Sequence, residues 1–118
     1  MASFSKIPFS GSTDGRGIKV VATSIGSGTT IHTATSDATL PDIITVYAFN
    51  SDTSDRTLTL GWGGTTSPDD LVGPLTIPTQ SGLVLVVADL ILRNSLVVKA
   101  AASSANVIAL FGYVNRIS

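Results

Sequence analysis

Residues 42–50, with the sequence DIITVYAFN, give the clearest indication of the fold. β-Branched and aromatic residues dominate this stretch, and such residues favour extended strands. Successive side chains of a strand point to opposite faces, so the stretch divides into two sets. One set consists of Ile43, Thr45, Tyr47 and Phe49, and the other of Ile44, Val46 and Ala48. Both sets are mainly apolar, although a two-layer antiparallel sandwich needs only one apolar face on each strand.

The flanking sequence repeats this strand pattern in both directions. Turn residues separate the strand-like segments at intervals of about 8–12 residues, which is typical of a sandwich or barrel. The predicted strands are residues 18–24, 29–35, 42–50, 56–62, 75–77, 82–87, 96–101 and 106–114. Residues 88–92 are the one segment where a helical turn is expected. The pattern predicts an all-β fold, an antiparallel β-sandwich of about eight strands, but jelly-roll, immunoglobulin-like and barrel strand orders fit it equally.

The chain divides into a short arm and one folded domain. A length of 118 residues leaves room for a single core. Residues 1–17 are expected to form an extended N-terminal arm, because Pro8 and several glycines interrupt regular structure there. Residues 18–118 are expected to form the β-sandwich domain. Phe4, Ile7 and Phe9 of the arm are apolar, so we expect the arm to dock onto another surface.

The composition is poor in charge and rich in hydroxyl groups. Only 13% of the residues are charged, against about 25% in an ordinary soluble domain. All eight acidic residues are aspartate, and the chain lacks the glutamate that commonly covers helix surfaces. Serine and threonine number 15 each. Hydroxyl groups can face water or pack against a partner without burying a charge.

Several predicted strands are apolar on both faces. Residues 82–87 and 106–114 share this property with residues 42–50. The second face must be covered by the arm, by a long loop or by another subunit, since soluble monomers avoid large exposed apolar patches. We therefore expect an oligomer or a docking protein. The alternative is a closed barrel with a hydrophobic exterior.

Charge and hydropathy exclude several classes of partner. The net charge of −1 argues against a nucleic-acid-binding protein, which needs a basic face, and gives no electrostatic reason to bind an anionic membrane. The longest apolar stretch, residues 83–92, is about half the ~20 residues that a transmembrane helix needs. The N-terminus lacks the apolar segment of a signal peptide, so synthesis and folding in a cytoplasm are expected. The absence of cysteine excludes a disulfide scaffold.

The sequence offers little catalytic chemistry. His32 is the single histidine, and one histidine without cysteine cannot supply the ligands of a zinc site. We expect His32 to be a strand residue that faces solvent or a neighbour. Asp69 with Asp70, and Asp52 with Asp55, lie in turn-forming sequence where aspartate commonly caps its own backbone. No enzymatic activity, catalytic residue, metal site or cofactor is therefore expected.

The glycine-rich stretch from residue 61 to residue 66 contains the only tryptophan. It lacks the Gly-Lys-Ser/Thr ending of a phosphate-binding loop. Trp62 could stack on a sugar ring or anchor an interface, but a tryptophan at the rim of an ordinary core fits the sequence as well.

Four short phrases resemble small virion proteins of tailed bacteriophages. They are residues 28–34 (GTTIHTA), 46–50 (VYAFN), 58–71 (LTLGWGGTTSPDDL) and 112–117 (GYVNRI). Among these proteins the chain is most similar to capsid decoration (cement) proteins. The resemblance implies a jelly-roll sandwich that stands as a homotrimer on the capsid surface of the virion, synthesised in the bacterial host cytoplasm.

The same resemblance implies that the arm grips the major capsid protein. The expected interface residues are Phe4, Ile7, Phe9, Trp62, Phe111 and Tyr113. The alternative is a carbohydrate-binding or tail/fibre module of a phage particle, in which Trp62, Tyr47 or Tyr113 would stack on a sugar and Asp69 with Asp70 would bind its hydroxyl groups.

Overall fold

The computed structural model describes residues 3–66, 68–70, 72–80 and 82–118. The first two residues of the predicted arm and Ser67 in the loop after Trp62 lie outside these ranges. The described residues form nine strands and one short 3₁₀ turn, η1 (Ile25–Ser27). The strands are β1 (Phe4–Ile7), β2 (Ile18–Lys19), β3 (Thr29–Thr33), β4 (Asp42–Asn50), β5 (Arg56–Trp62), β6 (Val72–Ile77), β7 (Val84–Leu92), β8 (Val97–Ala102) and β9 (Ile108–Ile117).

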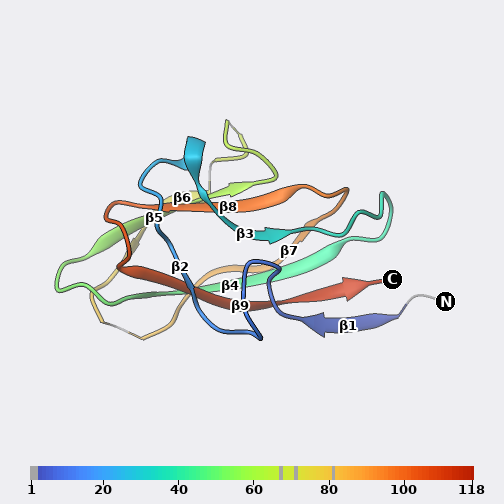
Figure 1. Ribbon diagram of the computed structural model, residues 1–118, viewed down its shortest axis with the longest axis horizontal. Helices are drawn as coiled ribbons and strands as arrows, with labels where there is room; N and C mark the ends of the chain where they lie inside the picture. The colour runs from blue at the N-terminus through green and yellow to red at the C-terminus, as the bar shows by residue number, and fades with distance from the viewer. Residues whose placement is uncertain (1–2, 67, 71, 81) are drawn as a thin grey trace.

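The strands form two antiparallel sheets packed face to face (Figure 1). The first sheet has the order β1-β9-β4-β7, and β2 pairs with β9 on the same side as β1. The second sheet has the order β3-β8-β5-β6. The antiparallel pairs are β2·β9, β3·β8, β4·β7 and β5·β6, so in sequence order each pair encloses the next. The chain therefore has the pairing of one long antiparallel hairpin, whose strand pairs are divided between the two sheets. This is the strand arrangement of a jelly roll, so the predicted jelly-roll sandwich is confirmed.

The core lies between the two sheets, and strand alternation selects its residues. The inward set of β4 is completely buried at Ile44, Val46 and Ala48. Facing and neighbouring strands contribute further buried side chains, which are Leu58, Leu60, Ile77, Val98, Ala100, Ile108, Leu110 and Val114. The alternation seen in the sequence therefore sets which face of β4 is packed against the opposite sheet.

The helical turn predicted for residues 88–92 is wrong. β7 continues through this segment to Leu92 and pairs with β4 along its whole length. The irregularity in the sequence corresponds to a bulge, since the register shifts between Ile44 and Val46 and Asp89 has a φ of 56°. A bulge of this kind inserts an extra residue into one strand, which breaks the alternation that marks a strand in the sequence.

Much of the N-terminal arm is docked onto its own domain. β1 pairs with the last residues of β9, and Ser3 exchanges backbone hydrogen bonds with Ser118 (Figure 1). Phe9 enters the core and is 2% exposed. It packs at Gly112, where a Cβ atom would lie 2.8 Å from the Cζ of Phe9. Phe9 is therefore a core residue, which corrects the expectation that it meets a partner.

Candidate functional site

The exposed edge of the first sheet carries the main cluster of uncovered aliphatic side chains. Leu83, Leu85, Leu90 and Ile91 are 56%, 51%, 42% and 58% exposed, and we call them the β7 patch. β7 ends the strand order of its sheet, so its outer edge has no pairing partner among the described strands. Asp89 is the only charged residue in β7. Edge strands are usually protected by charge, proline or bulges, and β7 has such protection only at the bulge around Asp89.

Leu85 and Ile91 of the β7 patch lie on the outer face of the sheet, since they pair with the outward Tyr47 and Ile43, and from Leu85 this face continues as a band of half-buried aromatic residues. Tyr47 of β4 is paired with Leu85 on one side and with Phe111 of β9 on the other. Tyr47 and Phe111 are both partly exposed. The outer face is therefore apolar from β9 to β7, as the alternation in residues 42–50 predicts.

The arm covers the β9 end of this band. Gly17 lies against the ring of Phe111, since a Cβ atom there would be 2.6 Å from the Phe111 Cζ. The ammonium group of Lys6 sits 4.5 Å from the centre of the Tyr113 ring, a cation–π contact. The arm therefore covers the apolar outer face of the first sheet at β9. The same face remains exposed to solvent near β7.

The six predicted interface residues do not form one surface. Phe4 is 73% exposed on β1, and Phe9 is in the core. Ile7, the last residue of β1 in the arm, packs partly against the core. Trp62 also packs against the core, and its Nε1–H donates a hydrogen bond to the carbonyl oxygen of Ile91 at 3.1 Å. Phe111 and Tyr113 lie under the arm, so Phe4 is the most exposed of the six and Trp62 the one that adjoins the β7 patch.

A buried ionic cluster joins the two sheets, and the sequence did not predict it. His32 of β3 and Asp42 of β4 are 1% and 0% exposed. The Nε2–H of His32 donates to Asp42 Oδ2 at 2.8 Å. Arg116 donates from Nε to Asp42 Oδ1 at 2.8 Å and from Nη2 to Oδ2 at 2.9 Å, and the Thr35 N–H also donates to Oδ2. Of the two expectations for His32, a strand residue that faces solvent or a neighbour, the structure shows the second.

The cluster fixes the charge state of its members. Burial alone would raise the pKa of Asp42, but the hydrogen bonds from Arg116 and His32 outweigh it and hold that pKa below its usual value. Burial lowers the pKa of His32, and the attraction of Asp42 only partly opposes this. Asp42 is therefore a carboxylate and His32 a neutral imidazole at neutral pH.

The cluster is suited to holding structure and not to acid–base catalysis. The Nδ1 of His32 accepts a hydrogen bond from the Ser10 N–H at 3.0 Å, so both ring nitrogens have protein partners. A general base must reach a proton on a substrate, and this imidazole is sealed from solvent. One signal in the sequence pointed to the cluster, because alternation places Asp42 on the same face as the buried Ile44 and Val46.

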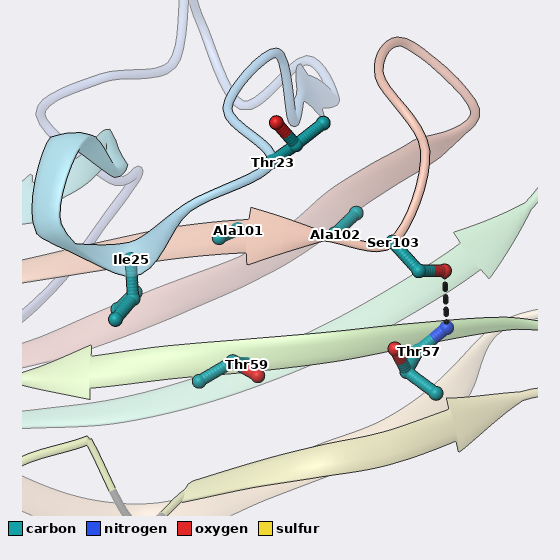
Figure 2. Close-up of a pocket in the computed structure, with 7 residues that line it drawn as sticks. All are labelled: Thr23, Ile25, Thr57, Thr59, Ala101, Ala102 and Ser103. Atoms are coloured by element: carbon teal, nitrogen blue, oxygen red, sulfur yellow. Dashed lines mark hydrogen bonds between the residues drawn. The ribbon is translucent and has the colours of Figure 1, made fainter.

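A shallow hollow of about 170 Å³ lies over β5 and β8 beside η1 (Figure 2). Its lining residues are Thr23, Ile25, Thr57, Thr59, Ala101, Ala102 and Ser103. The hydroxyl oxygen of Ser103 accepts a hydrogen bond from the Thr57 N–H at 3.0 Å. Hydroxyl and aliphatic groups can bind a small polar molecule, but none of these seven side chains titrates near neutral pH. The hollow supplies no acid or base of its own.

Asp52 caps the backbone of its own turn, as the sequence predicts, whereas Asp55 caps the backbone of residue 79, outside that turn. Asp52 accepts hydrogen bonds from the Thr53 N–H and from Arg56, and Asp55 accepts one from the Thr79 N–H. Among the residues that the structure describes, no group of three or more histidine, cysteine or acidic side chains could hold a metal ion. Within the same residues no helix is long and apolar enough to cross a membrane.

The fold and surface together define a small jelly-roll β-sandwich with one uncovered apolar edge. Comparisons with protein-family models, with curated proteins and with solved structures found no match.

Proposed function

We propose that the chain is a structural protein of a tailed-bacteriophage particle, a capsid decoration protein that binds the major capsid protein and associates with copies of itself. The observation that carries the proposal is the β7 patch, in which Leu85, Leu90 and Ile91 lie on an edge strand without a partner among the described strands and Leu83 directly precedes it, all 42–58% exposed. Burial of a fully exposed side chain of this kind is worth roughly 1.5–3 kcal/mol, and these side chains are about half exposed, so each contributes about half of that to an association of copies. The resemblance to decoration proteins supports the choice of partner.

Assembly through this patch would use two kinds of contact. Copies of the chain meet at the β7 patch, and three copies form the homotrimer that the resemblance implies. The first residues of the arm meet the capsid, since Phe4 is 73% exposed and held at the tip of β1. Each contact is modest, but many copies on one shell add through multivalency.

The capsid contact is tested by co-sedimentation. Capsid shells assembled from the major capsid protein of the source phage alone are mixed with the purified chain and pelleted. We expect saturable binding. We expect Phe4→Ser to weaken it by roughly tenfold or more, because the substitution removes the exposed ring that the capsid contact would bury. Val21→Ser is the matched control, since Val21 is 57% exposed but lies outside the arm.

Two results would contradict the proposal. Failure of the unmodified chain to bind the shells removes the decoration function, and equal binding by the Phe4→Ser and unmodified chains removes the arm contact. Deletion of residues 2–16 is not a suitable test, because it would take Phe9 out of the core.

The carbohydrate-binding alternative has less support. The indole N–H of Trp62 is bonded to Ile91 and its ring packs against the core. One face of the Tyr113 ring is occupied by Lys6. A sugar platform needs an aromatic face that is open to solvent, so these residues are poorly placed for stacking.

A further inference from the structure

The segment 9–11 crosses from the first sheet to the edge of β3 (Figure 1). Three hydrogen bonds hold it there. The Gly11 N–H donates to the Ile31 carbonyl at 2.9 Å, the Thr33 N–H donates to the Ser10 hydroxyl at 2.7 Å, and the Ser10 N–H donates to His32 Nδ1 at 3.0 Å. The Phe9 ring also lies beside the imidazole, with 6.1 Å between the ring centres. One contact in this set, the bond to Nδ1, depends on a titratable group.

The surroundings of His32 fix which ring nitrogen carries the proton. Nδ1 accepts from a backbone N–H, which has no lone pair to offer, so Nδ1 must be unprotonated. Nε2 then carries the hydrogen and donates it to Asp42 of β4. Arg116 of β9 is the other charged group that acts on the ring, and its charge opposes a second positive charge there. β8 presents the apolar Val98 opposite His32.

Protonation would add a hydrogen to Nδ1, so that both ring nitrogens carry one, and this hydrogen would point at the N–H of Ser10. The bond to Asp42 would survive, but the bond to the arm would become a contact between two donors. We propose that His32 is a pH-sensitive latch that holds segment 9–11 against β3 while the imidazole is neutral and weakens this docking when the imidazole is protonated. This inference is independent of the proposed virion function.

The direction of the effect follows from proton linkage. Burial is the largest cause that lowers the pKa of His32 in the docked state, and release of the segment removes part of that burial, so the pKa of the released ring moves back toward its ordinary value of about 6.5. The released state therefore binds the proton more tightly. Docking has its full strength above about pH 6.5 and weakens as the pH falls below it, by at most about tenfold per pH unit for one proton. Asp42 stays ionised through this window, because its pKa lies below its usual value.

Amide hydrogen exchange of the full chain, followed by NMR, tests the latch. The protection factors of Ser10, Gly11 and Thr33 are measured from pH 7.5 to pH 5 and compared with that of Asn106, whose N–H donates to Val20 away from His32. We expect the protection of the first three to fall by up to about tenfold per pH unit below about pH 6.5. The protection of Asn106 should stay constant, and the ring nitrogens of His32 should show the Nε2–H tautomer at pH 7.5.

His32→Asn is the control variant. Its side-chain oxygen can accept the Ser10 N–H at any pH in this range, so the pH dependence should disappear even if the variant is less stable. The latch is overturned if Ser10 keeps its protection while His32 becomes protonated, or if Asn106 loses protection in parallel. It is also overturned if His32→Asn retains the pH dependence. Should the variant not fold, the measurement on the unmodified chain decides the question alone.

Discussion

Replacing Asp42 with alanine is expected to lower the free energy of unfolding at pH 7 by about 3–5 kcal/mol. The carboxylate is fully buried and accepts hydrogen bonds from Arg116, His32 and the Thr35 N–H. Its removal leaves the buried imidazole N–H without an acceptor, which carries the full desolvation penalty, and also deprives the partly exposed guanidinium group of its carboxylate. Urea unfolding at one fixed protein concentration measures the loss.

Asp52→Ala is the matched control for this substitution. Asp52 also pairs with an arginine, Arg56, at 2.6 Å, but both side chains are partly exposed to solvent. Surface ion pairs contribute little, so the loss should be much smaller. Equal losses in the two variants would contradict the structural role of the buried cluster.

The Asp42 effect should also depend on pH in a defined direction. The pKa of Asp42 is lowered in the folded protein, so its stabilising contribution is present above about 3.8, the value in the unfolded chain, and is lost as the pH falls through the folded value. The difference between the unmodified chain and Asp42→Ala should therefore narrow in strong acid.

The second large effect is expected for Phe9→Ala, at about 3–5 kcal/mol of unfolding free energy. Phe9 is 2% exposed and fills the space that Gly112 leaves open. Phe4→Ala is the control in the same arm, since Phe4 is 73% exposed and its truncation should change stability by less than about 0.5 kcal/mol. Urea unfolding of both variants at equal concentration gives the comparison. A small loss of unfolding free energy in Phe9→Ala would contradict the packing of the Phe9 side chain in the core.

Local sequence patterns predicted the strands well where alternation is regular. The bounds of β4 and β5 agree with the predicted residues 42–50 and 56–62. Predictions were poorer where the backbone departs from regular alternation. Only two residues of the predicted strand 18–24 form β2. The bulge at Asp89 interrupts the alternation of side chains, so the sequence pattern did not predict the second half of β7 as a strand. Periodicity detects regular strands and is insensitive to bulges and short edge segments.

The features that depend on distant pairing could not be predicted from local patterns. Asp42 and Arg116 are 74 residues apart, and the order of strands decides that they meet. The jelly-roll order was expected from resemblance and not from periodicity, which fits several sandwiches equally. The role of Phe9 was missed for the same reason, because the residue opposite it, Gly112, has no side chain and carries no hydrophobic signal.

Self-association through the β7 patch is the central claim, and the native mass of the purified chain tests it most directly. Sedimentation equilibrium over a wide concentration range should show a multiple of the 12.1 kDa chain, with a trimer as the expected species. The double variant Leu85→Ser with Ile91→Ser, at positions 51% and 58% exposed, should fold normally and sediment as a monomer. A monomeric unmodified chain at every concentration, or a double variant with unchanged mass, would contradict the account.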